Sequence, residues 1–291
     1  MPAMKRFRVG DCTVTRIPEL LIPDVPASAL LPDWDGQMPA DDAGAAEHCN
    51  AEAGTLTIAV HAWLLQMPQH TVLIDTGAGN GKARPDNALF DRLDTPWLTQ
   101  LQEAGVRAED VDLVINTHLH VDHVGWNTVL RDGVWAPTFP NASYVFSGPE
   151  YDYYSDEAHV KPASHGVFAD SVAPIMQAGL ARRIDRDDEE VVDGLRLHRT
   201  PGHSFDHLSV VLQRGNDTAL FAGDLMHHPV QVGHPGWNSV YCEIPAAARA
   251  SRAWALDFVA DHDAWYFSSH FAGSSAGKVK RTADGFAWQQ A

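Results

Sequence analysis

The stretch Thr117-His118-Leu119-His120-Val121-Asp122-His123 is the most informative part of this sequence. It directly follows residues 111–116, an apolar run that predicts a buried strand. Ligand-binding side chains in α/β sheets commonly lie on loops that leave the strands. The stretch offers three histidines and one aspartate, whereas a catalytic zinc takes about three protein ligands and keeps one position open. The spacing therefore indicates two metal ions, and a polar loop with ordinary hydrogen-bonded histidines is the alternative.

The surrounding sequence predicts alternating strands and helices. Two strand-like runs at residues 56–67 and 71–75 flank a Pro-Gln-His turn and lead into the glycine-rich segment 75–80. Further strands are expected at residues 7–17, 111–116, 195–199, 208–213, 218–222 and 264–267, and helices at residues 95–104 and 246–260. This order is typical of an α/β fold.

The histidine motif resembles that of the metallo-β-lactamase fold superfamily, and the resemblance can be followed from about residue 58 to residue 270. One further element of the family pattern precedes the motif and three follow it, all in the expected order. The earlier one is Ile74-Asp75-Thr76-Gly77, and the later ones are Thr200-Pro201-Gly202-His203, Phe221-Ala222-Gly223-Asp224 and Ser268-Ser269-His270. The resemblance implies one domain over residues 1–291, an αββα sandwich in which two mixed sheets lie face to face with helices outside.

Carried onto this sequence, the resemblance implies a dinuclear metal centre. One ion would be held by His118, His120 and His203, the other by Asp122, His123 and His270, with Asp224 between them and Asp75 hydrogen-bonded to a ligand from beneath. Imidazoles and carboxylates suit zinc best, and manganese, cobalt or iron are alternatives. A hydroxide held between the ions would attack a carbonyl or phosphoryl group, so no protein nucleophile is needed.

The residue three positions after Asp224 bears on the reaction. Related N-acyl homoserine lactonases have a tyrosine there, whereas this chain has His227 followed by His228. A histidine at this place resembles the methyl-parathion-hydrolase-like branch, and it could donate a proton to the developing oxyanion or the leaving group. Asp122 and His227 are therefore the expected catalytic side chains, and two ordinary structural histidines at 227 and 228 are the alternative. An apolar substrate wall is expected from Trp126, Phe205, Met226 and Trp237.

The expected function is hydrolysis of a lactone or related ester, with organophosphate hydrolase or arylesterase activity as the alternative. A β-lactamase ranks lower because no cysteine stands among the ligands. A glyoxalase II-like thioesterase ranks lower because the final stretch offers few basic residues, Lys278, Lys280 and Arg281. A non-catalytic metal-binding module of the flavo-diiron type would have glutamate in place of His120 and an added domain.

The amino-acid composition limits which classes of molecule the protein is expected to bind. The 291 residues carry 21 Lys and Arg against 38 Asp and Glu, a net charge of −17, which would repel nucleic acid and anionic membranes. The expected partner is a small, neutral ester or lactone. The sequence also contains 16 histidines, and together with the surplus of carboxylates these are the residues from which metal sites are built.

Three further features of the sequence predict the cellular location and the oligomeric state of the protein. Cys12, Cys49 and Cys242 are far apart and form no metal-binding pair, so they predict free thiols in a reducing compartment. No apolar leader and no membrane-length apolar run occurs, so a soluble cytoplasmic protein is expected. Residues from about 20 to 50 read as a proline-punctuated, ordered arm that packs on the body or on the partner subunit of a homodimer.

Overall fold

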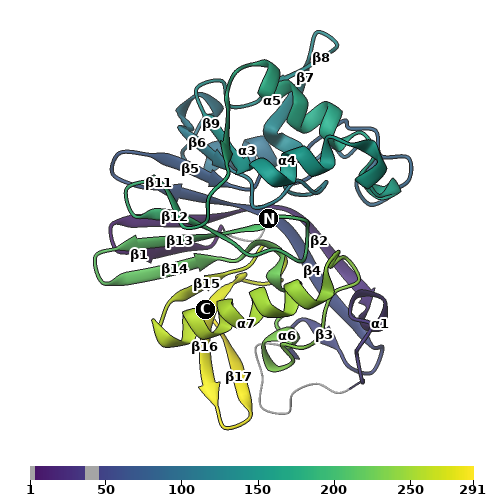
Figure 1. Ribbon diagram of the computed structural model, residues 1–291, viewed down its shortest axis with the longest axis vertical. Helices are drawn as coiled ribbons and strands as arrows, with labels where there is room; N and C mark the ends of the chain where they lie inside the picture. Colours follow the sequence, from purple (N-terminus) through teal and green to yellow (C-terminus); the bar gives the residue numbers. More distant parts are fainter. Residues whose placement is uncertain (1–3, 37–45) are drawn as a thin grey trace. The chain divides into compact units, whose positions relative to one another are not determined.

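The computed structural model describes residues 4–36 and 46–291, and Figure 1 labels its elements. The chain divides into two compact units, the first made of Met1–Glu19 and Val60–Arg186 and the second of Leu20–Ala59 and Asp187–Ala291. Two strands, β2 (Cys12–Pro26) and β4 (Thr55–Gln66), run from one unit into the other. The expectation of a single domain over all 291 residues stays a prediction.

The first unit contains most of an eight-stranded mixed sheet, ordered β1-β2-β4-β5-β6-β9-β10 with β3 paired to β4. Strands β5, β6, β9 and β10, which run from the middle of the sheet to one edge, are parallel. Because parallel strands are covered on both faces, β5 and β6 are almost entirely apolar and buried. The strand bounds are β1 (Arg6–Val9), β3 (Cys49–Asn50), β5 (Thr71–Ile74), β6 (Leu113–Ile115), β9 (Ser143–Ser147) and β10 (Ala181–Ile184). The unit also holds the hairpin β7 (Thr128–Arg131) and β8 (Val134–Pro137) and the helices α3 (Trp97–Glu103), α4 (Gly148–Tyr154) and α5 (Ala173–Gln177).

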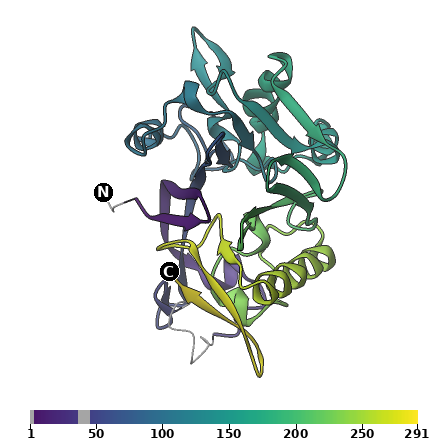
Figure 2. The same cartoon turned by 90° about the vertical axis from the view of Figure 1, so that its left-hand side faces the viewer.

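The second unit carries a seven-stranded mixed sheet in sequential order, in which only the pair β14 and β15 is parallel among the paired strands described. The strands are β11 (Glu189–Val192), β12 (Leu195–Arg199), β13 (Leu208–Arg214), β14 (Asp217–Phe221), β15 (Trp265–Phe267), β16 (Ala276–Thr282) and β17 (Gly285–Gln290). The helices are α1 (Ala27–Leu30), α6 (Val230–Gly233) and α7 (Pro245–Asp261). Figure 2 shows α7 and the β16–β17 hairpin, which close the chain in the yellow-green and yellow part of the ribbon.

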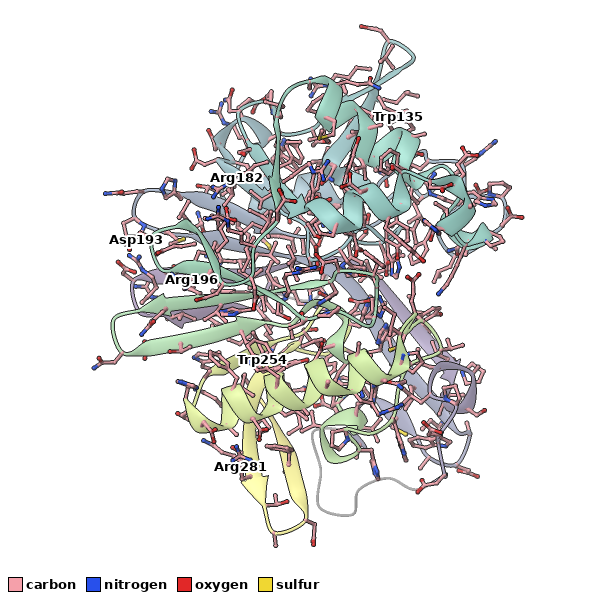
Figure 3. The ribbon with its side chains drawn as sticks, viewed as in Figure 1. Trp135, Arg182, Asp193, Arg196, Trp254 and Arg281 are labelled. Carbon is pink, nitrogen blue, oxygen red and sulfur yellow. The ribbon has the colours of Figure 1, made fainter. Side chains whose placement is uncertain are left out.

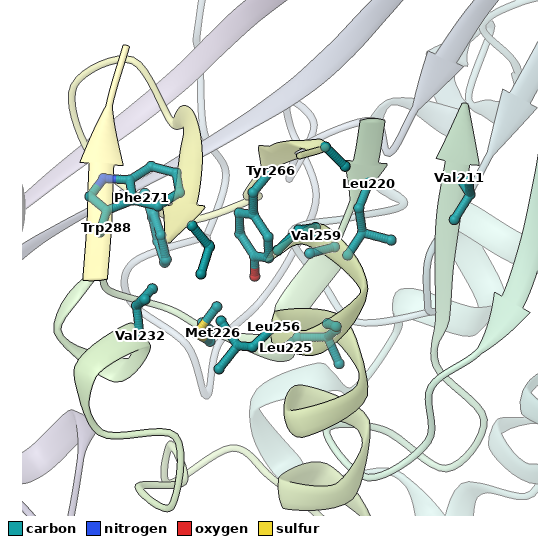
Figure 4. Close-up of a cluster of buried hydrophobic side chains, with 14 residues drawn as sticks. Val211, Leu220, Leu225, Met226, Val232, Leu256, Val259, Tyr266, Phe271 and Trp288 are labelled. Atoms are coloured by element: carbon teal, nitrogen blue, oxygen red, sulfur yellow. The ribbon is translucent and has the colours of Figure 1, made fainter. Parts of the chain in front are cut away.

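A buried cluster holds α7 to the sheet of the second unit. Leu256 and Val259 of α7 pack with Leu220 of β14 and Tyr266 of β15, and Met226 lies in the same cluster (Figure 4). Burying side chains of this size stabilises the unit by roughly 1.5–3 kcal/mol each. The cluster sits beside the loop that follows β14, so it fixes the segment on which Asp224 lies.

Most elements predicted around the motif are confirmed. The predicted hairpin at residues 56–67 and 71–75 forms as β4 and β5, with Trp63 opposite Ile74. The helix expected at residues 95–104 forms as α3, the helix expected at 246–260 as α7, and the later strands as β12 to β15. The single strand expected at residues 7–17 is wrong, because Gly10 adopts a φ of 56° and turns the chain between the antiparallel strands β1 and β2. The β16–β17 hairpin was not expected from the sequence.

The described part of the proline-punctuated arm is ordered and packs within its own unit. Residues 20–26 continue strand β2, and α1 follows directly. Ala27, Leu30 and Leu31 are buried against Leu56, Ile58 and Val230. Residues 37–45 of the predicted arm lie outside the described residues. The apolar content of the described arm thus contributes to the core of the second unit.

Several exposed cations of the second unit are paired with carboxylates. Arg196 lies 2.8 Å from Asp188, and Arg281 lies 2.7 Å from Asp261; both arginines are labelled in Figure 3. These pairs offset the positive charge of the arginines locally, so they present no unopposed cation to a phosphate backbone. Among the described helices, none has the length and apolar character needed to cross a membrane.

Candidate metal centre

The first unit brings three histidines of the predicted motif together on the loop after β6. The ring centroids of His118 and His120 are 4.5 Å apart, and those of His118 and His123 are 4.0 Å apart. Both His118 and His123 are buried, whereas the Asp122 carboxylate keeps 15% of its surface exposed and lies 3.7 Å from the Nε2 atom of His123. The motif therefore forms one compact group of potential donors.

Asp75 sets the protonation of two of these histidines. The Nδ1 atom of His123 lies 2.8 Å from Asp75 Oδ2, and because the carboxylate only accepts, Nδ1 carries the proton. The Thr117 hydroxyl donates to Asp75 over 2.9 Å and so accepts from the Nδ1 atom of His118 over 3.0 Å. In their neutral form both imidazoles therefore have the lone pair on Nε2, the form that binds a metal.

A glycine-rich loop positions Asp75, which has a left-handed φ of 57°. The half-buried Glu19 carboxylate accepts hydrogen bonds from the backbone N–H groups of Ala78 at 2.5 Å and Gly79 at 3.1 Å. Burial raises the pKa of this carboxyl group. A Cβ atom added to Gly125 would lie 1.9 Å from the backbone of Ala78, so the loop can approach the motif only with glycine there.

His120 has a partner that the sequence did not predict. Its Nε2 atom lies 3.2 Å from the hydroxyl group of Tyr154, which ends helix α4. The neighbouring backbone N–H of Leu119 donates to the buried carboxylate of Glu150, also on α4, over 3.2 Å. Helix α4 thus orients the second histidine of the motif, and no periodicity or motif in the sequence links residue 154 to residue 120.

The second unit gathers three histidines around Asp224, which lies just after β14. The Oδ2 atom of Asp224 is 3.1 Å from the Nε2 atom of His203, 3.4 Å from that of His227 and 3.0 Å from that of His270. His203, Asp224 and His227 form a group whose donor atoms lie close enough to hold one ion. All four side chains are nearly completely buried.

The chemistry of this donor set fits a divalent metal. The Nδ1 atom of His270 lies 2.8 Å from the carbonyl oxygen of Ala59, which only accepts, so Nδ1 is protonated and the lone pair is on Nε2. In the neutral imidazole that lone pair faces Asp224 Oδ2 at 3.0 Å, an arrangement that is favourable only when a metal ion or a proton lies between the two atoms. Imidazole nitrogen and carboxylate oxygen are ligands that zinc, manganese and iron accept.

His207 positions Asp224. The backbone N–H of Asp224 donates to the Nε2 atom of His207 over 3.0 Å, so His207 is neutral with its proton on Nδ1, which lies 2.9 Å from the Thr200 hydroxyl. The sequence held a weak signal for this residue, since Thr200 and His207 bracket Gly202-His203 much as Thr117 and His123 bracket the first motif.

The two histidines after Asp224 have different surroundings. The His227 ring stacks on that of His270, with centroids 5.0 Å apart, beside the Asp224 carboxylate. His228 accepts from the N–H of Val230 on Nδ1 and donates from Nε2 to the carbonyl of His48. Burial lowers the pKa of His228 to about 4, so it is neutral at ordinary pH. His228 therefore connects backbone segments of the second unit.

Of the side chains expected to form a substrate wall, two serve in packing. Trp126 is buried, stacks on Trp97 with centroids 5.5 Å apart and donates its indole N–H to Glu19. Met226 belongs to the core cluster of the second unit. Phe205 is 39% exposed, and Trp237 stacks on His234 beside the arm. Whether any of the four contacts a substrate stays a prediction.

A sequence model of the "Metallo-beta-lactamase superfamily" matches residues 57–270. The chain belongs to this superfamily. The match spans the same part of the chain as the resemblance found from the motif, so the predicted family is confirmed. The metallo-β-lactamase fold, with two mixed sheets and helices, is confirmed with it.

Named relatives of this superfamily member include lactonases. The chain is 27% identical to the N-acyl homoserine lactonase of Bacillus cereus over 175 residues, which cover 54% of this chain and 60% of the relative. It is also 27% identical over 167 residues to the metallo-beta-lactamase fold-containing protein ST1585 of Sulfurisphaera tokodaii, covering 53% of this chain and 52% of the relative. The chain thus matches little more than half the length of these curated relatives.

Solved structures share the fold over the whole chain. The hydrolase AbOPH superposes with a TM-score of 0.81 at 21% identity, covering 100% of this chain and 98% of that one. AidC, described as a dizinc quorum-quenching lactonase in complex with a product, superposes with a TM-score of 0.76 at 22% identity, covering 99% and 97% of the two chains. At these identities the likeness establishes the metallo-β-lactamase fold.

Proposed function

We propose that this protein is a dinuclear metal-dependent hydrolase that cleaves a lactone or a related ester. The observation that carries the proposal is the Asp224 cluster, in which the imidazoles of His203, His227 and His270 surround one carboxylate oxygen at 3.0–3.4 Å. The named lactonase relatives support the substrate class.

The proposed ligand set assigns His118, His120 and His203 to one ion and Asp122, His123 and His270 to the other, with Asp224 shared. Zinc is the proposed metal, with manganese, cobalt or iron as alternatives. When bound, two such ions supply a deprotonated water as nucleophile and withdraw charge from the substrate oxygen. In the proposal, Asp75 keeps the Nε2 lone pairs of His118 and His123 directed to the metal, and Asp122 and His227 contribute to catalysis.

A substrate panel tests the proposed function. The zinc-loaded protein is assayed on an N-acyl homoserine lactone, an aryl ester and a phosphotriester, each compared at kcat/KM. We expect turnover of the lactone or ester to exceed that of the phosphotriester. Hydrolysis of none of them by protein that retains its metal would contradict the proposal and favour a non-catalytic metal-binding module. The net charge of −17 supports a neutral substrate over a polyanion.

Organophosphate hydrolase or arylesterase activity is the second candidate, and the specific observation that favours it is His227. This imidazole lies beside Asp224 at the position where related lactonases carry a tyrosine, and it could serve as a proton donor. We expect His227→Phe to lower kcat about a hundredfold, the lower range for a lost general acid. Metal content, measured on the same sample, separates this effect from loss of an ion. An unchanged rate would leave His227 a packing residue.

Two further parts of the proposal concern location and assembly. None of the three cysteines, all within the described ranges, forms a disulfide, which supports a reducing compartment such as the cytoplasm. The homodimer and the cytoplasmic location stay predictions.

A further inference from the structure

A small apolar cavity lies beside His120 in the first unit. Its volume is about 20 Å³, room for about one methyl group or one water molecule. The side chains that shape it are Tyr154, Val160, Val167, Phe168 and Val172, together with His120. Its surface is predominantly apolar, and a water molecule needs two or more polar partners to be stable in such a space. The cavity therefore suits a hydrocarbon group better than water.

The cavity wall is built by an irregular segment between α4 and α5. Two short 3₁₀ helices, Glu157–His159 and Pro162–Ser164, are followed by a π-helical turn at Phe168–Val172. The N–H of Ala173 donates to the carbonyl of Phe168, five residues earlier. Short π-helical turns interrupt regular helices at a cost and occur often at functional sites. This turn sets Val167, Phe168 and Val172 around one space.

The opposite side of the cavity belongs to the metal motif. His120 lines the cavity and is held by the Tyr154 hydroxyl, 3.2 Å from its Nε2 atom. His120 therefore borders both the metal motif and this apolar space. Small-molecule sites commonly combine such an apolar pocket with a few polar groups that fix orientation.

We propose that this cavity binds a short apolar chain on the acyl side of the substrate, and that its size limits the length of that chain. The inference rests on the proposed hydrolase function and deepens it. Since the space admits about one methyl group, acetyl or propanoyl esters fit, and longer chains require the wall to open. Val172→Ala removes two methyl groups from the wall, and Phe168→Ala, at a half-buried position, tests the same wall with less risk to folding.

Chain-length preference measures the effect. The zinc-loaded wild type, Val172→Ala and Phe168→Ala are assayed on aryl esters with two-, four-, six- and eight-carbon acyl groups. We expect kcat/KM of the wild type to fall already from the two-carbon to the four-carbon ester, and each variant to shift the optimum to a longer chain. The gain for the longer chain is expected to be about fourfold for each additional methylene buried. Val106→Ala is the matched control, because Val106 is buried in the same unit and does not line the cavity.

The ester assay and a binding measurement together distinguish failure of the cavity assignment from failure of the hydrolase proposal. If esters are hydrolysed but the preference is the same in all four proteins, or if the variants change preference only for the alcohol side, the cavity assignment is wrong and the hydrolase proposal stands. If nothing is hydrolysed, the hydrolase proposal fails, and calorimetric titration with hexanoate still decides the cavity. Tighter hexanoate binding by Val172→Ala than by wild type and Val106→Ala supports the cavity, and equal binding overturns it.

Discussion

Replacing Asp224 by asparagine is expected to lower kcat at least about a thousandfold and to reduce the bound metal from two ions per chain to one or none. The Oδ2 atom of Asp224 lies within 3.4 Å of three imidazole nitrogens, so the substitution removes the single negative charge on which the cluster converges. Loss of a group that holds a catalytic ion removes stabilisation made chiefly in the transition state.

Two measurements isolate this effect from unfolding. Thermal unfolding shows whether the variant keeps its fold, and elemental analysis gives the ions per chain. Asp217→Asn is the matched control, because Asp217 is exposed at the other end of β14 and the same atoms are exchanged. Full activity of Asp224→Asn protein that holds no metal would refute the proposed metal centre.

The second large effect is expected from Asp75→Asn. Asparagine tolerates the left-handed φ of 57° at this position, so the backbone of the loop should be retained. The variant amide can present its N–H₂ group to His123 or Thr117, which disturbs the tautomers that direct Nε2 to the metal. Loss of a partner behind a metal ligand typically lowers metal affinity by about 10–100-fold. Competition with a chelator of known affinity measures the change.

Asp132→Asn is the control for the Asp75 variant. Asp132 also has a positive φ, 50°, but it is exposed at the turn between β7 and β8. The control therefore places the same substitution at a position with a similar left-handed φ. Equal zinc affinity of the two variants would mean that Asp75 does not act through the histidine tautomers.

Much of the candidate site could be predicted because its potential metal ligands lie in short, recognisable stretches of sequence. The stretch from His118 to His123 is contiguous, and Asp75, Asp224 and His270 each follow a short apolar strand that is visible as such. Strand ends were therefore good indicators of donor positions. In the structure the Nε2 atoms of His203 and His270 lie 3.1 Å and 3.0 Å from Asp224 Oδ2, and the role of these residues as metal ligands stays a prediction.

The rest depended on contacts between segments far apart in sequence. Tyr154 reaches His120 from a helix 34 residues later, and His207 holds the backbone of Asp224 from 17 residues earlier. The segment that forms the cavity wall has neither helical nor strand periodicity, so its π-helical turn left no recognisable pattern. Aromatic and apolar residues near a motif serve equally as a substrate wall and in packing, so the sequence could not distinguish these two roles for Trp126 and Met226, both of which are buried.

The most direct test of the central claim is a zinc titration of chelator-stripped protein with simultaneous measurement of ester or lactone hydrolysis. The proposed dinuclear centre predicts no hydrolysis without metal, a rise with added zinc and saturation at two ions per chain. Hydrolysis by protein stripped of metal, or saturation of zinc binding at two ions without any hydrolysis, would contradict it.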